Sequence, residues 1–276
     1  MAFLERLARR LPDIGDDAAV VRAPDGPLLL AADALVEGVH VDLSITTAAD
    51  FGWKALAVNA SDIAAMGGRP LYALVTVVVP TGRGADLEAL YEGLLDASAA
   101  FDCAVVGGDL SSGPALTVSV AVAGTVDDGG PGPVLRSGAR PGDLLWVTGP
   151  LGAAARDLGR RWPGRAHARP EPRLEAGAAA RRAGATAMLD LSDGLALDLR
   201  RLAVASGVGV VVDDVPLAEG ATLEQALAGG DDYELLAASP VPLPGWLPVG
   251  HCTGDPQERR LGAAPLPAGG WSHAWS

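Results

Sequence analysis

The sequence is poor in lysine, cysteine, aromatic residues and long apolar runs. Its 276 residues include one lysine, Lys54, and two cysteines, Cys103 and Cys252, and aromatic residues make up 4% of the chain. Two isolated cysteines do not make a disulfide framework, so we expect free, buried thiols. The longest apolar run, residues 71–80, is about ten residues long. A membrane span needs about 18 or more, so we expect no membrane partner.

The scarcity of lysine excludes one class of phosphate site. A Walker A loop needs Gly-Lys-Ser or Gly-Lys-Thr, and Lys54 stands between Trp53 and Ala55. The glycine-rich Rossmann fingerprint and the protein-kinase motif set are missing as well. The N-terminal residues also lack the continuous apolar stretch of a signal peptide, so we expect a cytoplasmic protein.

Basic residues are fewer than acidic ones. There are 34 acidic and 21 basic residues, which gives a formal net charge of −13. Nucleic-acid binding needs basic patches that neutralise phosphates, so we expect no nucleic-acid partner. A protein this acidic can serve a polyanionic substrate only through cations. Apolar residues make up 49% of the chain, which is enough for a folded core in one large domain or in two of roughly 140 residues.

Hydrophobic periodicity predicts an α/β (α+β) fold of two domains. In the first half the expected strands are 28–32, 71–79, 104–106 and 115–126, and the expected helices are 1–10, 47–66 and 87–100. A Gly- and Pro-rich connector follows, so we place the domains at 1–137 and 138–276. In the second half the expected strands are 144–148, 187–189 and 208–212, and a loop is expected over 163–173. One helix is expected after residue 152, a second over 175–183, and a third with Ser192 as its N-cap.

Aspartates stand in a predicted turn, at the expected ends of strands, at the expected start of a helix and within the Ala-rich helix expected over 47–66. The residues concerned are Asp17, Asp33, Asp62, Asp109, Asp190 and Asp193. Each one alone is equally understood as a turn or cap residue. Together they favour a metal site, because α/β folds gather ligands at strand ends and Mg²⁺ takes carboxylates together with substrate phosphates. Such ions would join an acidic protein to a polyanionic nucleotide.

Three further positions fit a nucleotide site, and each has a simpler reading. Gly107 and Gly108 follow a predicted strand and would let backbone amides approach phosphate. Arg136 suits bidentate phosphate binding, or it is a surface arginine. His40 follows Asp33 closely enough to share its site, or it is an ordinary core or solvated histidine.

Seven short motifs resemble those of thiamine-monophosphate kinases, in the same order and with similar spacing from about residue 14 to the C-terminus. They cover residues 15–19, 32–40, 54–67, 107–109, 136–143, 189–194 and 229–235. The wider superfamily is that of aminoimidazole ribonucleotide synthetase. The resemblance implies a synthetase-like fold of two α/β domains, in which the N-terminal mixed sheets of two subunits pair into a barrel-like dimer core.

The resemblance also implies an activity and a set of site residues. The activity is transfer of the ATP γ-phosphoryl group to thiamine monophosphate, with several Mg²⁺ ions, ATP as co-substrate and a homodimer. Asp62, Asp109 and Asp193 would be catalytic. Mg²⁺ would be bound by Asp17, Asp33, Asp62, Asp109, Asp190 and Asp193. ATP would contact Gly108, Asp109, Arg136, Ser192 and Tyr91, and thiamine monophosphate would contact His40, Asp231 and Trp271.

Two departures from the family pattern keep alternatives open. Ala31 and Ala32 stand where the family usually has Ser-Thr hydroxyls beside the metal, and Asp231 stands where it often has Glu. The alternatives are another ATP-dependent synthetase of the superfamily and a non-catalytic metal-binding homologue. Trp271 would stack on a thiamine ring, or it is a tail tryptophan packed on the core.

Overall fold

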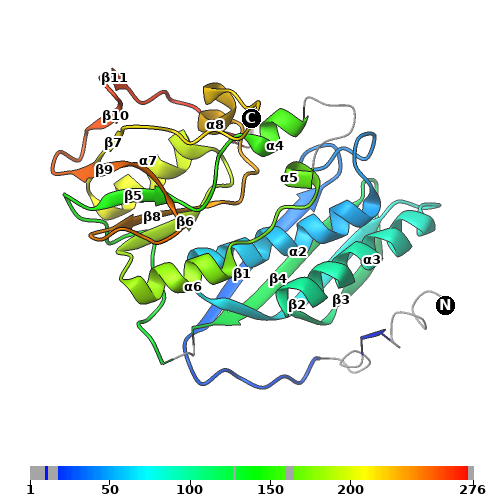
Figure 1. The fold of residues 1–276 in the computed structure, drawn as a ribbon. Helices are drawn as coiled ribbons and strands as arrows, with labels where there is room; N and C mark the ends of the chain where they lie inside the picture. Colours follow the sequence, from blue (N-terminus) through cyan, green and yellow to red (C-terminus); the bar gives the residue numbers. More distant parts are fainter. Residues whose placement is uncertain (1–9, 12–17, 127–128, 159–164, 273–276) are drawn as a thin grey trace. The chain divides into compact units, whose positions relative to one another are not determined.

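The computed structural model describes residues 10–11, 18–126, 129–158 and 165–272, and they divide into two compact units (Figure 1). The first unit is drawn from residues 1–63 and 69–128, and the second from residues 64–68 and 129–276. The helix expected over residues 1–10 and the predicted metal ligand Asp17 fall outside the described residues, apart from Arg10. No helix within the described ranges is long and apolar enough to cross a membrane.

The first unit is a four-stranded mixed sheet with two long helices. Its elements are β1 (Leu28–Val36), α2 (Ala48–Ala65), β2 (Arg69–Val79), α3 (Gly84–Phe101), β3 (Ala104–Ser112) and β4 (Thr117–Thr125). The strand order is β1-β4-β2-β3, in which β2 and β3 run parallel and the other pairs are antiparallel. α2 and α3 lie on one face of this sheet (Figure 1).

One face of the sheet makes the core of the first unit and the other is open. Val118, Val120 and Val122 of β4 are buried, and they alternate with residues that are exposed or half-buried. On the opposite face Leu30 and Leu74 are 73% and 50% exposed. This period of two is that of a sheet covered on one side only.

Two strands run further than the sequence predicts. β1 continues through Asp33 to Val36, and β3 continues through Asp109 to Ser112. Asp33 and Asp109 therefore lie inside strands, and the prediction that they terminate them was wrong. The reason is pairing: β1 keeps an unbroken antiparallel register with β4, and hydrogen bonds to a neighbouring strand outweigh the low strand propensity of aspartate.

The second unit is built around a seven-stranded mixed sheet of order β11-β10-β7-β9-β5-β8-β6. Its strands are β5 (Leu144–Val147), β6 (Ala187–Asp190), β7 (Gly209–Val212), β8 (Leu235–Ser239), β9 (Leu247–Thr253), β10 (Arg259–Leu261) and β11 (Ala264–Pro265). Its helices are α4 (Ala153–Leu158), α5 (Arg165–Ala168), α6 (Leu174–Ala183), α7 (Leu195–Ser206) and α8 (Leu223–Ala228). The short helix α5 lies within the loop predicted over 163–173.

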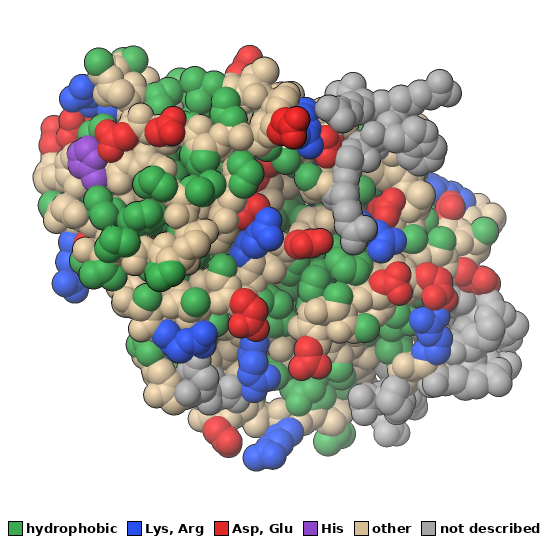
Figure 2. All heavy atoms as spheres, in the orientation of Figure 1, with side chains coloured by type: hydrophobic (Ala, Val, Ile, Leu, Met, Phe, Trp, Pro, Cys, Tyr) green, Lys and Arg blue, Asp and Glu red, His purple; other side chains and the backbone are tan. Residues whose placement is uncertain are grey.

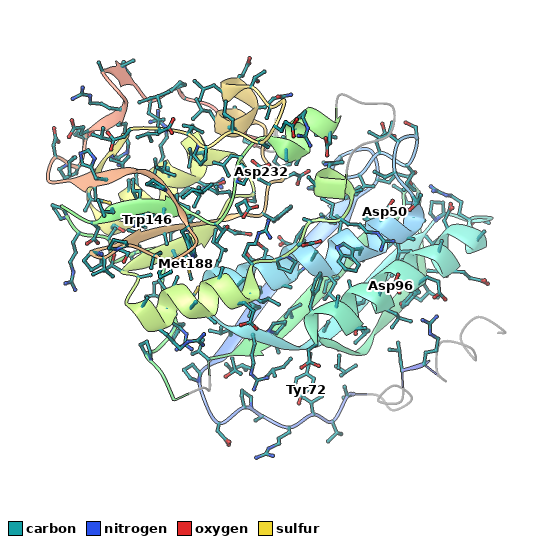
Figure 3. The ribbon with its side chains drawn as sticks, viewed as in Figure 1. Asp50, Tyr72, Asp96, Trp146, Met188 and Asp232 are labelled. Carbon is teal, nitrogen blue, oxygen red and sulfur yellow. The ribbon has the colours of Figure 1, made fainter. Side chains whose placement is uncertain are left out.

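This sheet has a core on each face. Leu236 and Ala238 of β8 pack with the apolar side of α7, whereas Leu235 and Ala237 pack on the opposite face, whose core includes Ala180 of α6. Met188 and Trp146, which are labelled in Figure 3, belong to the α6 face. The two sheets with their helices confirm the α/β expectation.

The start of α7 differs from its prediction. The helix begins at Leu195 with Gly194 as N-cap, and not with Ser192. The Asp198 carboxylate, one turn into the helix, accepts the backbone N–H of Asp193 at 2.9 Å. A side chain from inside the helix therefore holds the backbone that precedes the helix, and residues 191–194 form a loop between β6 and α7.

Candidate active site

In the first unit, a buried asparagine joins the strand that carries Asp33 to the helix that carries Asp62. The backbone N–H of Asp33 donates to Asn59 Oδ1 at 3.0 Å, and Asn59 Nδ2 donates to the Ala55 carbonyl at 2.9 Å. Asn59 is completely buried. Asp62 follows Asn59 by three residues in α2, so it lies on the same side of that helix. The structure thus brings the backbone of Asp33 to the helix side that bears Asp62.

The Gly108-Asp109 pair lies in β3 beside β2. Gly108 has φ +150°, and a Cβ atom there would lie 2.8 Å from the backbone nitrogen of Val75, so only glycine fits. The Asp109 carboxylate is exposed and accepts from Ser111 Oγ at 2.9 Å. Burial raises the pKa of Tyr91, and the negative charge of Asp109 raises it further. Tyr91, Gly108 and Asp109 therefore belong to one neighbourhood of the first unit.

His40 lies in the loop after β1 with its ring held in one orientation. Its Nδ1 accepts the backbone N–H of Val36 at 3.1 Å, so in the neutral ring the proton sits on Nε2. Its carbonyl accepts from Nζ of the single lysine, Lys54, at 3.3 Å. The ring and the backbone of His40 are both held by hydrogen bonds, which gives the ring a defined position.

In the second unit, two loops that carry predicted site residues are joined by backbone hydrogen bonds. The Asp231 N–H donates to the Ser192 carbonyl at 2.8 Å, and the Tyr233 N–H donates to the Leu191 carbonyl at 2.9 Å. Asp231 has φ +61°. The structure therefore brings Ser192 and Asp231 together, although they are far apart in the sequence.

The Asp231 carboxylate also faces a histidine that the sequence did not indicate. His167 Nδ1 lies 3.2 Å from Asp231 Oδ2, and the His167 side chain is 3% exposed. The signal was absent because His167 lies in a Pro- and Arg-rich segment with no periodicity. This contact sets one oxygen of the carboxylate toward the interior.

The next residue, Asp232, has a structural task. Its carboxylate accepts the backbone N–H groups of Gly152 at 2.7 Å and Ala154 at 3.3 Å, at the start of α4 (Figure 3 labels Asp232). Burial raises the pKa of this carboxyl to about 6, against the lowering effect of the two hydrogen bonds. Asp231 therefore stays a predicted site residue, whereas the carboxylate of Asp232 is hydrogen-bonded to the backbone of the fold.

Asp190 ends β6 and Asp193 lies in the loop that follows, beside a charge cluster that the sequence did not indicate. Arg201 forms ion pairs with both Asp193 and Asp198. Burial is the main cause that raises the pKa of Asp198 to about 6, and the charges of Asp193 and Asp190 add to the increase. Asp198 and Arg201 are three residues apart, which places them one turn apart on α7. This spacing was the feature of the sequence from which their ion pair could have been predicted.

Trp271 reaches the same loop through its backbone. Its N–H donates to the Asp193 carbonyl at 3.0 Å, and its side chain is 39% exposed. Ser192, Asp193, Asp231 and Trp271 thus form one group of neighbours in the second unit.

Arg136 is placed differently. The Ser206 hydroxyl, at the C-terminal end of α7, donates to the Arg136 carbonyl at 3.4 Å, and the neighbouring Leu135 carbonyl accepts from Met188 in β6. Asp193 precedes the opposite end of α7, which is about 18 Å long at 1.5 Å per residue. The structure does not bring the Arg136 backbone to the Asp193 loop, and its exposed side chain keeps its ATP contact as a prediction.

The acidic residues fit Mg²⁺ by their chemistry. Among the residues that the structure describes, no three acidic, histidine or cysteine side chains lie close enough together to hold a metal ion by themselves. The predicted donors are carboxylate oxygens, and Mg²⁺ binds through one or two carboxylates while keeping waters and substrate phosphates as its other ligands. On the face shown in Figure 2, acidic and basic side chains are interspersed among apolar ones.

Known proteins match this chain over most of its length. The family described as AIR synthase related protein, N-terminal domain, matches residues 15–126. A thiamine-monophosphate kinase of Rhodopirellula baltica is 38% identical in an alignment 264 residues long, which covers 86% of this chain and 79% of that protein. The thiamine-monophosphate kinase of Stenotrophomonas maltophilia has a crystal structure with TM-score 0.84 and 31% identity, covering 97% of each chain.

A structure of AaThiL complexed with AMPPCP and TMP has TM-score 0.81 and 31% identity, and it covers 99% of this chain and 96% of that one. Sequence and fold agree over the same span, and the predicted resemblance is confirmed. The chain belongs to the thiamine-monophosphate kinase family.

Proposed function

We propose that this protein transfers the γ-phosphoryl group of ATP directly and in line to the phosphate of thiamine monophosphate. The ATP-dependent reaction itself is that of its curated relatives, and it is carried by one observation: 38% identity with a thiamine-monophosphate kinase over 86% of the chain. AaThiL with an ATP analogue and TMP bound has the same fold. The acceptor oxygen is already anionic, so the reaction needs alignment and charge neutralisation more than a strong base.

The aspartates would hold the cations that this neutralisation requires. We assign Mg²⁺ binding to Asp17, Asp33, Asp62, Asp109, Asp190 and Asp193, with Asp62, Asp109 and Asp193 closest to the chemistry. Bound Mg²⁺ would neutralise the phosphate oxygens as the two polyanions approach. Ala31 and Ala32 replace hydroxyl groups of the family pattern, so their presence removes no carboxylate from the site. Water molecules would complete the coordination of Mg²⁺.

The chain's own donors would bind the phosphates. The exposed backbone at Gly108 would approach ATP, with Arg136, Ser192 and Tyr91 as further ATP contacts. Neutral His40 would donate from Nε2 to the phosphate of thiamine monophosphate, because its Nδ1 is already occupied by the Val36 N–H. Residues 1–137 would bind ATP and Mg²⁺ and would form the dimer contacts. Residues 138–276 would complete the substrate site.

The remaining residues would recognise the thiamine moiety. Asp231 would accept hydrogen bonds from it, while Oδ2 of the same carboxylate lies 3.2 Å from His167 Nδ1. Trp271 would stack on an aromatic ring, which its partly exposed indole allows.

We further propose a cytoplasmic homodimer. The open face of the first unit's sheet carries Leu28, Leu30 and Leu74, which are exposed over half or more of their surface. A second copy would cover this apolar face by isologous pairing of the same strands. The two cysteines are free and buried, which agrees with a reducing compartment.

The decisive experiment measures ADP formation by the purified protein from ATP and thiamine monophosphate, with and without Mg²⁺. We expect turnover that needs both the metal and thiamine monophosphate, and thiamine diphosphate as the second product. ADP without thiamine diphosphate would favour another synthetase reaction of the superfamily. Absence of ADP in the presence of Mg²⁺ would favour the non-catalytic metal-binding homologue.

A further inference from the structure

Residues 266–271 form a strap that runs from the small strand β11 along α7 to the loop containing Asp193. Three separate contacts hold this segment, and they act on consecutive parts of it. Trp271 is its last residue, and the proposed function gives the Trp271 ring a place against thiamine, so the inference below rests on that function.

The first contact anchors the beginning of the strap. Nη2 of Arg200, in α7, donates to the carbonyls of Leu266 at 2.5 Å and Pro267 at 3.2 Å. The Leu266 side chain is 2% exposed, and its N–H donates to the Arg259 carbonyl at 2.9 Å. One guanidinium on α7 therefore holds two successive carbonyls of a chain that has no helix or strand of its own there.

The second contact is a close approach at Gly270. Its φ is +133°, and a Cβ atom there would lie 2.8 Å from Leu197 Cδ2 and 3.0 Å from the Asp193 carbonyl oxygen. A Cβ atom at the preceding Gly269 would lie 3.1 Å from Ala228 Cβ, at the end of α8. The strap can lie against α7 at this point only because residue 270 is glycine.

The third contact joins the end of the strap to the Asp193 loop. The Trp271 N–H donates to the Asp193 carbonyl at 3.0 Å, which fixes the Trp271 backbone beside a predicted metal ligand. An indole has only two rotatable side-chain bonds, so a fixed backbone leaves the ring few positions. Asp231 belongs to the same group of neighbours, because its N–H donates to the Ser192 carbonyl.

We propose that the strap sets the position of the Trp271 ring for substrate binding, with Arg200 and Gly270 as its positioning residues. Neither of them touches substrate in this arrangement. Their loss releases the ring from its place while the metal ligands and the nucleotide contacts remain. The affected quantity is therefore the binding of thiamine monophosphate, and not that of ATP.

The test compares Gly270→Ala with Gly262→Ala. Gly262 also has a positive φ, of +57°, and precedes β11, but a Cβ atom there would meet nothing within 4 Å. We expect Gly270→Ala to raise KM for thiamine monophosphate about tenfold with little change in KM for ATP or in kcat. Gly262→Ala keeps wild-type values. Equal kinetics in the two variants would overturn the proposal, and so would an equal rise in both KM values.

A second readout needs no catalysis. Protein labelled with 5-fluorotryptophan gives a ¹⁹F signal for Trp271, which Trp271→Phe assigns. Without substrate, we expect Gly270→Ala and Arg200→Met to shift and sharpen this signal, whereas Gly262→Ala and Arg260→Met leave it unchanged. An unshifted Trp271 signal in Gly270→Ala would show that the strap does not position the ring.

The same signal separates failure of the strap from failure of the proposed function. If Trp271 contacts thiamine, thiamine monophosphate shifts its signal in the wild type. A second outcome is a Trp271 signal that depends on the strap and yet stays unchanged when thiamine monophosphate is added. That result would show that Trp271 does not contact the substrate, and it would overturn the inference about binding. It would leave the kinase reaction to be judged by product formation alone.

Discussion

At the scale of single residues, the aspartates of this chain divide by what surrounds each carboxylate. Asp109 is exposed and accepts a serine hydroxyl, whereas Asp193 is paired with an arginine and Asp232 is hydrogen-bonded to two backbone amides. An exposed carboxylate is available to a cation, and one that caps a helix is committed to the fold. This difference yields opposite predictions for substitutions that look alike.

Asp62→Asn and Asp109→Asn remove one negative charge each and keep the size of the side chain. We expect turnover to fall at least about a hundredfold in each variant, with unfolding free energy nearly unchanged, because neutral amides bind Mg²⁺ poorly. The matched control is Asp96→Asn, on the exposed side of α3 (Figure 3), which keeps its activity. Near-normal turnover in both site variants would remove these residues from the metal site.

Asp232 gives a prediction about stability and pH. Burial in the folded protein raises the pKa of its carboxyl to about 6 from an ordinary value of 3.8. The folded protein therefore holds this proton more tightly than the unfolded chain does, and the corresponding stability is present below pH 4 and lost as pH rises through 6. In Asp232→Asn this loss is absent, and the amide oxygen still accepts a backbone N–H.

Urea unfolding of the wild type and of Asp232→Asn between pH 4 and 7 checks this. We expect the unfolding free energy of the wild type, relative to the variant, to decline by about 2 kcal/mol between pH 4 and 6.5. A difference that stays constant, or that rises with pH, would contradict the raised pKa.

At the scale of elements, an ion pair ties the start of α6 to the strand β8. Arg173, the N-cap residue of α6, donates to both oxygens of Glu234, at 2.8 and 2.5 Å, and Thr148 Oγ1 donates to the same carboxylate at 2.5 Å. The Glu234 side chain is 7% exposed. A carboxylate this buried depends on its partners, because an unpaired buried charge is costly.

We therefore expect Arg173→Met to lower the unfolding free energy by about 3 kcal/mol, since it leaves the Glu234 charge unpaired. The double variant Arg173→Met with Glu234→Met loses less than the sum of the single changes. Arg260→Met, which breaks a surface pair with Glu258, changes stability by no more than about 0.5 kcal/mol. Denaturant titration of the four proteins measures the coupling, and additive losses would show that the pair is energetically independent.

At the scale of the whole molecule, the exposed apolar face of the first sheet predicts the oligomeric state. We expect the wild type to be a dimer, and Leu30→Glu with Leu74→Glu to be a monomer, because two like charges would be buried at the centre of the paired face. Val204→Glu on α7 is the control, since Val204 is 73% exposed, as Leu30 is. Sedimentation equilibrium measures the mass, and a double variant that stays dimeric would place the interface elsewhere.

Most elements were predictable from local pattern. The helix expected over 47–66 is observed as Ala48–Ala65, and the strand expected over 71–79 as Arg69–Val79, because periodicity and a closing Gly or Pro mark both. The ends of β1 and β3 and the N-cap of α7 were wrong. There the outcome depended on a neighbouring strand or on a carboxylate five residues away, and neither is encoded in local propensity.

The sequence by itself determined the chemistry that is available: one lysine, no Walker A loop, an excess of carboxylates, and seven motifs in the order of one kinase family. Only the tertiary structure decided which group meets which. It assigned Arg201 to Asp193, His167 to Asp231, and the Trp271 N–H to the Asp193 carbonyl. The reason is physical: these contacts join distant segments across a packed sheet and helix, and hydrophobic period reports only which side of an element is buried.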